Sequence, residues 1–256
     1  AAEPRDPAQD CHPNIVCYPE DILPGSGVVG LIVNGTTYCT GSLVNNTSED
    51  GTPYLLTATH CLNNDYDARF LANRKYDMVA GTIVAFFNYQ SPLCSTDIRG
   101  PLQMTLASAD SLLISERHDI SLLRLKDIPP ASYQPYYLGW DASATPLAPF
   151  HGIHHPNGGI KKVAIDEGSL SLTSFPGSKY NMKPNAHWEM KGWETGATEG
   201  GSSGSPLLDR QKRIVGTLTG GISMCSSPRG PDQYASLYKF WNVSDSLDNP
   251  LPINYY

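Results

Sequence analysis

The chain has 256 residues, of which 40% are hydrophobic, so it is long enough to bury a large core and its composition argues against disorder. Its formal net charge is -7 and it has no long Lys/Arg cluster, which argues against nucleic acid as a partner, because binding a phosphate backbone takes several cationic side chains. No apolar run approaches the roughly 20 residues of a membrane-spanning helix, so we expect no membrane partner.

The N-terminal sequence and the cysteines bear on the compartment. The chain begins Ala1-Ala2-Glu3-Pro4, without Met or the charged-then-apolar order of a signal peptide, so we expect a soluble product processed from a precursor. Six cysteines permit three disulfides, and they lack the Cys-x-x-Cys pairs of a structural zinc site. We therefore expect a secreted, extracellular protein, with free buried thiols as the alternative.

Short β-rich segments separated by Gly, Pro, Asn and Ser dominate the chain in order. Strands are expected in the first half at Val28–Val33, Thr37–Val44, Tyr54–Ala58, Met78–Asn88, Ser111–Ile114 and Ile120–Leu125. Strands are expected in the second half at Tyr136–Trp140, Lys162–Ile165, Ser169–Phe175, His187–Lys191 and Arg213–Leu218. Tyr234–Trp241 is the best helical candidate. This pattern predicts an all-β barrel or sandwich fold rather than βαβ units.

The chain is expected to divide into three parts. An N-terminal segment covers residues 1–27, and two comparable β lobes cover residues 28–130 and 131–256, the second with the C-terminal helix. The proline-rich stretch Lys126–Pro130 forms the connection between the lobes.

Three segments carry the chemistry. Thr198–Pro206 presents Ser203 among glycines, which let backbone amides turn inward without Cβ obstruction. A serine hydroxyl needs an adjacent base to become a nucleophile, and His60 can supply it at neutral pH. Asp119 would bind the other imidazole nitrogen and stabilise the imidazolium. The backbone amides of Gly201 and Ser203 are placed in sequence to bind the negative oxygen of the intermediate.

Each of these residues alone has a structural interpretation. His60 alone is a polar core residue beside a cysteine, Asp119 a turn or cap residue, and Ser203 a loop residue. Their order in the chain favours catalysis, and it argues against a serine esterase, whose acid follows the serine. A catalytically silent binding protein predicts the loss of at least one of the three, and all are present.

The three segments resemble the chymotrypsin-fold serine proteases: Thr57-Ala58-Thr59-His60-Cys61, Asp119-Ile120-Ser121-Leu122-Leu123 and Gly201-Ser202-Ser203-Gly204-Ser205-Pro206. Further segments make the chain most similar to the secreted bacterial lysyl endopeptidases. These are Cys39–Thr47, Asn88–Gln90, Gly139–Asp141, Ile153–Asn157, Val215-Gly216 with Gly220-Gly221, and Asp232–Tyr234.

The resemblance implies two six-stranded antiparallel β-barrels with the active site in the cleft between them. It implies disulfides that join Cys11 to Cys225, Cys17 to Cys94, and Cys39 to Cys61. It also implies a monomeric endopeptidase, made as a zymogen, that needs no cofactor. Its partners would be protein or peptide substrates and protein protease inhibitors.

The substrate-binding residues depart from the wider family. Ala197 stands where trypsin-like enzymes carry the specificity aspartate, so the resemblance assigns Asp232 to that role, with Thr219, Gly220 and Gly221 along the pocket. A buried carboxylate selects a basic side chain, which predicts cleavage after Lys and also Arg. The alternatives are an acidic or small first-subsite preference, and for Asp232 a solvated turn.

The residues around the three motifs differ from the wider family at further positions. Ser202 replaces the aspartate that captures a freed N-terminus in the wider family, so that activation switch is expected to be absent. Thr173-Ser174-Phe175 lacks the tryptophan that follows it in lysyl enzymes. Glu194 and Glu199 are expected to be rim charges, and Trp140 and Trp193 core or cleft-wall aromatics. His151, His154 and His155 are expected in a structural loop rather than a metal site, because no His-Glu-x-x-His spacing occurs.

Overall fold

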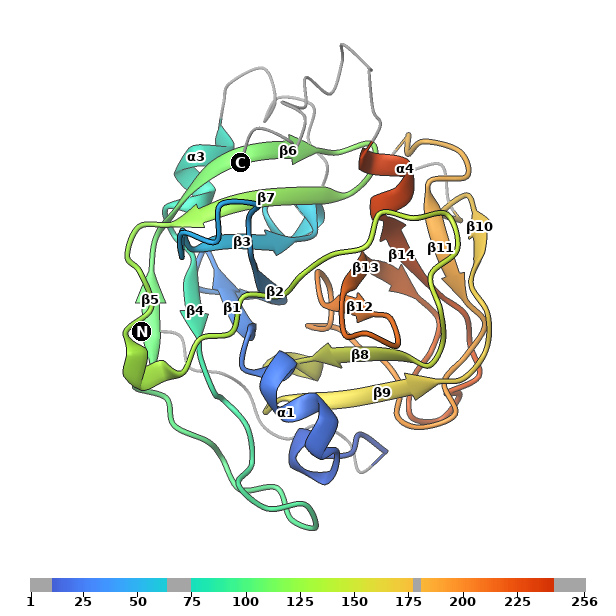
Figure 1. The fold of residues 1–256 in the computed structure, drawn as a ribbon, viewed down its shortest axis with the longest axis horizontal. Coiled ribbons are helices and arrows are strands. Elements are labelled where there is room, and N and C mark those ends of the chain that lie inside the picture. The colour runs from blue at the N-terminus through green and yellow to red at the C-terminus, as the bar shows by residue number, and fades with distance from the viewer. Residues whose placement is uncertain (1–10, 64–74, 177–180, 242–256) are drawn as a thin grey trace.

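The residues that the structure describes form two antiparallel sheets of seven strands each (Figure 1). The computed structural model describes residues 11–63, 75–176 and 181–241. The first sheet has the order β5-β4-β1-β2-β3-β7-β6 and the second the order β10-β11-β14-β13-β12-β8-β9. The bounds in the first sheet are β1 Val28–Val33, β2 Thr37–Val44, β3 Tyr54–Thr57, β4 Val84–Phe86, β5 Thr105–Ala107, β6 Ala109–Ser115 and β7 Ile120–Leu125. Those in the second are β8 Phe150–His154, β9 Lys162–Asp166, β10 Ser171–Thr173, β11 His187–Met190, β12 Pro206–Leu208, β13 Ile214–Gly221 and β14 Asp232–Ser236.

Each sheet closes on itself because its two outer strands follow one another in the chain. Only Ser108, with φ 72°, separates β5 from β6, and β5 pairs with β4 while β6 pairs with β7. In the second sheet, residues 167–170 join the outer strands β9 and β10. Counted as one bent strand each, these pairs give two six-stranded antiparallel barrels, which confirms the expected fold class.

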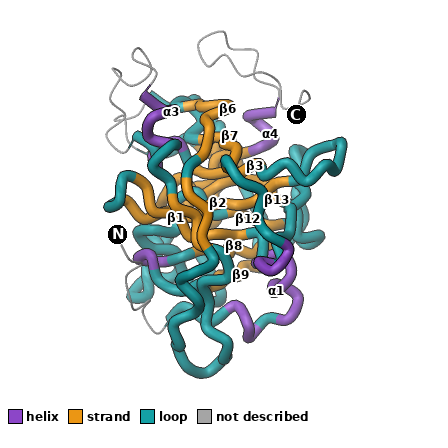
Figure 2. The backbone as a smooth tube through the Cα atoms, turned by 90° about the vertical axis from the view of Figure 1, so that its left-hand side faces the viewer, coloured by secondary structure: helices purple, strands orange, loops and turns teal. Residues whose placement is uncertain are grey.

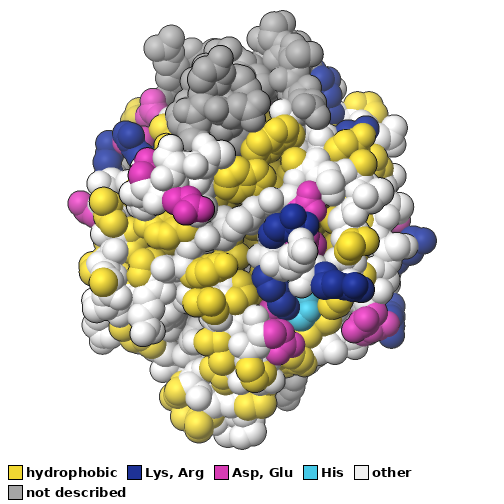
Figure 3. Space-filling model, in the orientation of Figure 1, with side chains coloured by type: hydrophobic (Ala, Val, Ile, Leu, Met, Phe, Trp, Pro, Cys, Tyr) yellow, Lys and Arg dark blue, Asp and Glu magenta, His cyan; other side chains and the backbone are white. Residues whose placement is uncertain are grey.

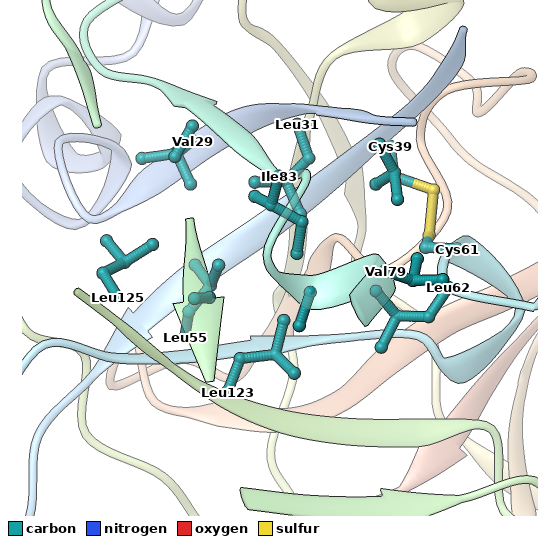
Figure 4. Close-up of a cluster of buried hydrophobic side chains, with 14 of the residues drawn as sticks. Val29, Leu31, Cys39, Leu55, Cys61, Leu62, Val79, Ile83, Leu123 and Leu125 are labelled. Atoms are coloured by element: carbon teal, nitrogen blue, oxygen red, sulfur yellow. A yellow bond between two sulfur atoms is a disulfide. The ribbon is translucent and has the colours of Figure 1, made fainter. Parts of the chain in front are cut away.

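The core of the first sheet is aliphatic. Figure 4 shows side chains from β1, β3 and β7 converging with Ile83 beside the Cys39–Cys61 disulfide. All six residues of β1 are buried, because both of its faces are covered. In the second sheet Phe150, Trp188, Trp193 and Tyr234 provide a more aromatic core. Burial of each large apolar side chain contributes roughly 1.5 to 3 kcal/mol to folding.

The two sheets lie side by side, and β1 contacts β8 at their junction (Figure 2). This contact is close: a Cβ on Gly30 of β1 would lie 3.4 Å from the ring of His155. On the face shown in Figure 3, the main group of Lys and Arg side chains has acidic side chains among it. Some basic side chains are paired, as in the ion pairs Lys212–Asp21 and Arg213–Asp209.

Helices are short. In the described part of the chain they are α1 Pro19–Gly25, α3 Lys75–Ala80 and α4 Leu237–Trp241, with 3-10 turns η1 Ile15–Cys17, η2 Thr59–Cys61, η3 Ala131–Tyr133 and η4 Pro156–Gly158. The expected C-terminal helix is present but begins at Leu237, since Tyr234–Ser236 belong to β14. Helix α1 was not predicted, although Pro19 at its start and Glu20 and Asp21 in its first turn are typical of a helix N-terminus.

Two strand predictions were wrong. The first part of Met78–Asn88 is the end of α3, and only Val84–Phe86 forms a strand, because a short apolar run does not distinguish the two. Tyr136–Trp140 is not a strand and makes only isolated bridges at Leu138 and Trp140. Strands β5, β8, β12 and β14 were not anticipated as strands.

Three disulfides are present, and they join Cys11 to Cys225, Cys17 to Cys94, and Cys39 to Cys61. These are the pairs that the resemblance implies. Cys11 and Cys17 attach the N-terminal segment to both halves of the chain, across separations of 214 and 77 residues. Buried Asp21 adds to this attachment by pairing with His151 and Lys212, each at 2.6 Å. In the described ranges, no helix has the length and apolar character to span a bilayer.

Candidate active site

Strand pairing brings His60 and Asp119 together. Strands β3 and β7 are antiparallel, with Thr57 opposite Ser121. His60 follows the end of β3 and Asp119 precedes the start of β7, so both lie at the same end of this strand pair. Asp119 Oδ2 lies 2.8 Å from His60 Nδ1, and Asp119 Oδ1 accepts the backbone N–H of His60 at 2.8 Å.

The burial of this pair is unequal. Asp119 is fully buried and has φ 58°, which is uncommon for a residue other than glycine, whereas 16% of the His60 side chain is exposed. Burial lowers the pKa of His60, but the charge of Asp119 and its hydrogen bond together outweigh this, so the pKa is raised. Asp119 therefore stabilises the protonated ring, and one ring nitrogen remains for a reaction partner.

Ser203 reaches the same place from the other half of the chain. Its backbone O accepts the N–H of Thr40 in β2 at 2.8 Å, and Cys61 Sγ lies 3.7 Å from the same oxygen. Gly204 makes this approach possible, because a Cβ there would lie 2.2 Å from Thr57 Oγ1 and its φ is 80°. Among the described residues, no hydrogen bond joins Ser203 Oγ to His60. Such bonds are often loose in a substrate-free site and tighten in the complex.

The backbone around Ser203 orients two amides. Gly200 O accepts the N–H of Asn157 at 2.5 Å, and Ser202 O accepts the N–H of Ser205 at 3.0 Å. In a planar trans peptide the next N–H points the opposite way, so the N–H groups of Gly201 and Ser203 face away from these contacts. Within the described part of the chain, neither N–H has an acceptor. They are free donors next to the serine hydroxyl.

Asp232 is fully buried at the start of β14. Its Oδ2 accepts three hydrogen bonds of 2.7 Å, from Trp193 Nε1, Thr198 Oγ1 and Ser223 Oγ. Among the described residues, the one hydrogen bond that its Oδ1 accepts comes from the N–H of Ser223 at 3.4 Å. Burial raises the pKa of Asp232, and the Trp193, Ser223 and Thr198 hydrogen bonds oppose that rise. Asp232 is thus not the solvated turn acid that the sequence left open.

The other expected pocket residues lie along the same strand pair. Gly221 and Gly220 are opposite Asp232 and Gln233, and a Cβ on Gly221 would lie 2.1 Å from Asp232 Oδ1. Thr219 is 7% exposed. A Cβ on Gly220 would lie 3.7 Å from Phe175, so an aromatic ring lies beside this strand even without the tryptophan of the lysyl enzymes.

Several residues of the site were not found from the sequence. Trp193, Thr198 and Ser223 are the donors to Asp232, and no spacing along the chain indicates this. The expectation that Glu199 is a rim charge was wrong, because its side chain is 9% exposed, accepts a 2.6 Å hydrogen bond from Asn157 and lies 3.5 Å from His12. Glu194 is exposed.

The clustered histidines have separate partners. His151 Nδ1 pairs with Asp21, His154 Nδ1 with Ser202 Oγ, and His155 Nδ1 with Gly159 O. A compact group of Cys11, His12 and Cys225 has metal-ligating atoms within 4.8 Å of one another, but the two sulfurs are bonded to each other and are not thiolates.

Two closed antiparallel barrels, with His60 and buried Asp119 paired on one and a glycine-flanked serine before β12 on the other, are the arrangement of the chymotrypsin-fold serine proteases. Solved structures agree on the fold. An inactive form of Rv3671c from M. tuberculosis has a TM-score of 0.56 at 14% identity and covers 90% of each chain. A Glu endopeptidase has a TM-score of 0.51 at 15% identity, over 91% of this chain and 95% of that one.

The family model described as the lysyl endopeptidase C-terminal domain matches residues 6–235, and the chain belongs to this family. Lysyl endopeptidase of Pseudomonas aeruginosa is 30% identical over 204 residues, which are 76% of this chain and 39% of that protein. Snake venom serine proteinase 14 of Crotalus adamanteus is 24% identical over 86% of this chain and 81% of that protein. The chain thus spans well under half the length of its bacterial relative.

Proposed function

We propose that this protein is a serine endopeptidase that hydrolyses peptide bonds after basic residues, Lys and also Arg, through an acyl-enzyme. The observation that carries the proposal is the buried Asp119 that pairs with His60 at 2.8 Å where the Ser203 loop meets the first barrel. The lysyl endopeptidase relative supports the same activity.

In this mechanism His60 Nε2 removes the proton of Ser203 as its Oγ attacks the substrate carbonyl carbon. The N–H groups of Gly201 and Ser203 bind the oxygen that becomes negative. His60 then gives the proton to the leaving amine and the C–N bond breaks. A water molecule, deprotonated by His60, attacks the acyl carbon, and the bond to Ser203 Oγ breaks as His60 returns the proton to that oxygen and the acid product is released.

The charge of Asp232 supports selection of a basic side chain. Asp232 is buried, and within the described ranges no Lys, Arg or His pairs with it. A buried carboxylate without a cationic partner is costly, and a substrate ammonium would supply that partner. The negative charge of Asp232 would repel an acidic substrate side chain, and a small side chain would leave the Asp232 carboxylate without a cationic partner.

The uneven hydrogen bonding of Asp232 supports a preference for Lys over Arg. Oδ2 already accepts three donors, which leaves Oδ1 as the oxygen with spare capacity. A single available oxygen suits the compact ammonium of Lys, whereas Arg gains most from two parallel hydrogen bonds to a carboxylate.

We further propose a secreted monomer, made as a precursor, whose partners are protein or peptide substrates and protein protease inhibitors. The three disulfides support an oxidising compartment. For the domains we propose an N-terminal segment of residues 1–27 and two units, residues 28–130 and 131–256. Residues 1–10, 64–74, 177–180 and 242–256 of these parts lie outside the described ranges.

The test is to measure cleavage of fluorogenic peptides that differ only before the scissile bond, by the wild type and by Asp232→Asn. We expect Asp232→Asn to lower kcat/KM for the Lys peptide by about 100-fold or more, because the substrate cation loses its buried partner. Ser203 should still react with a small sulfonyl fluoride. Asp110→Asn, the same change at a surface ion pair with Arg124, serves as the matched control.

Equal turnover of Ala, Glu and Lys peptides by the wild type would refute basic specificity. Unchanged Lys cleavage in Asp232→Asn would show that another group selects the substrate. Failure of Ser203 to react with the sulfonyl fluoride at neutral pH would instead favour a catalytically silent binding protein.

A further inference from the structure

Ser202, between the two proposed oxyanion donors, has a side chain that faces the interior. It is fully buried, as is His154 of β8, and its Oγ lies 2.7 Å from His154 Nδ1. The same Oγ accepts the N–H of Glu199 at 3.1 Å, and Ser202 N–H donates to Glu199 O at 3.0 Å. The Glu199–Ser203 turn is therefore closed on itself and joined to the second barrel through one imidazole.

Other carbonyls of the turn accept hydrogen bonds from residues outside it. Gly200 O accepts from the N–H of Asn157, Gly201 O from Thr40 Oγ1 at 2.9 Å, and Ser203 O from Thr40 N–H. Gly201 has φ 88°, and a Cβ there would lie 2.8 Å from the backbone of both Gly158 and His155. The turn thus lies directly on the loop that follows His154.

We propose that His154 and Ser202 are positioning residues, whose hydrogen bond holds the N–H groups of Gly201 and Ser203 toward the substrate carbonyl. This inference rests on the proposed peptidase activity. In the wider family a charged pair involving the residue before the nucleophile has this task, and here a neutral hydrogen bond performs it.

The chemistry of the pair fits this role. Burial first, and then the neighbouring His12, His155 and Lys162, lower the pKa of His154 well below its ordinary value, so its ring is neutral. The Glu199 N–H occupies one lone pair of Ser202 Oγ, which leaves the Ser202 proton and the second lone pair to pair with either tautomer of His154 at Nδ1. A neutral pair avoids the desolvation cost that a buried charge would carry.

His12 covers this arrangement from the N-terminal segment. It is 2% exposed, and its ring meets that of His154 edge-on at 5.5 Å between centroids. Its Nε2 lies 3.5 Å from Glu199 Oε2, and the adjacent Cys11 is bonded to Cys225. The N-terminal segment therefore keeps water away from the His154–Ser202 contact and attaches to the same turn.

The test compares His154→Phe, which keeps a ring but removes the hydrogen-bonding nitrogen, with His154→Asn, whose side-chain amide can occupy the place of Nδ1. Four quantities are measured per titrated active site: kcat for a Lys peptide, KM for the same peptide, inhibition by a peptide aldehyde ending in lysinal, and inhibition by n-pentylamine. The aldehyde adduct places an oxyanion at the two N–H groups, whereas the amine occupies only the side-chain pocket.

We expect His154→Phe to lower kcat by about 10- to 100-fold, up to the loss seen when one oxyanion donor is removed, with KM changed less than about threefold. Aldehyde binding should weaken in parallel, amine binding should be unchanged, and His154→Asn should recover most of the loss. His151→Phe is the matched control, since His151 is a buried histidine of the same strand that bonds Asp21 instead. It should cost stability but not kcat.

Normal kcat and aldehyde affinity in His154→Phe would overturn the inference, as would an equal loss in His151→Phe or an equal loss of amine binding. If His154→Phe does not fold, Ser202→Ala, which removes only the hydroxyl, answers the same question. If the wild type cleaves peptides and His154→Phe and Ser202→Ala cleave them equally well, only the positioning role is refuted. A wild type that cleaves no peptide refutes the peptidase proposal, and the positioning role with it.

Discussion

Replacement of Asp119 by Asn tests the proposed roles of all three site residues at once. Asp119 accepts two 2.8 Å hydrogen bonds, from the backbone N–H and from Nδ1 of His60. An amide has one acceptor atom, its oxygen, and an NH2 group that only donates, so if its oxygen keeps the backbone N–H, its NH2 group faces Nδ1. The imidazole proton must then move to Nε2, which can no longer accept the proton of Ser203.

We expect Asp119→Asn to lower kcat by about 10,000-fold, equivalent to about 5 kcal/mol of barrier, with little change in KM. The pH dependence should move as well. In the wild type, burial lowers the pKa of His60 and Asp119 more than reverses this, so the acid limb lies above the ordinary histidine value. In the variant only burial remains, and the acid limb should move to lower pH.

The assay is kcat/KM for a fluorogenic Lys peptide between pH 5 and 9, with active sites titrated and circular dichroism used to check folding. The tautomer argument would be refuted by a folded variant whose kcat falls by less than about tenfold, or whose acid limb in the pH profile stays in place.

Two further predictions concern packing and pH. Gly204→Ala should lower kcat by about 100-fold, because its Cβ would meet Thr57 Oγ1 at 2.2 Å and displace Ser203, whereas Gly35→Ala, with a similar positive φ but no atom within 4 Å, should leave kcat unchanged. Equal effects on kcat would contradict this. Burial lowers the pKa of His155 to about 3 and of His187 to about 4, so the unfolded state binds more protons and stability should fall by roughly 3 to 4 kcal/mol between pH 7 and 5. His60, with its raised pKa, acts in the opposite direction, and urea unfolding that shows no net loss would refute this prediction.

The sequence predicted the strands best where apolar residues and turn residues alternate clearly. Val28–Val33, Thr37–Val44 and Ile120–Leu125 have the same bounds in the structure. Met78–Asn88 failed because a short apolar run forms a helix turn or a strand according to its partners. Phe150–His154 and Asp232–Ser236 were missed for a related reason: their polar residues are buried against partners far away in the chain.

The residues of the site also fall into two groups, those that a local motif predicts and those that only the fold brings together. The identities of His60, Asp119 and Ser203 come from local motifs, because each motif carries the glycines or strand residues that its own turn needs. The hydrogen bonds that Asp232 accepts from Trp193, Thr198 and Ser223 cannot be found from a local motif, because these donors are 39, 34 and 9 residues away in sequence.

By itself, the sequence determined the reaction class that we propose, the all-β architecture and the supply of six cysteines, because these depend on residue types and short-range spacing. Only the tertiary structure decided which atoms meet: the Asp119–His60 bond, the unequal hydrogen bonding of the two Asp232 oxygens, and the inward bond between Ser202 and His154. A hydrogen bond tolerates only a few tenths of an ångström of variation in its donor–acceptor distance. The closing of the two barrels sets these distances between residues that are far apart in the chain.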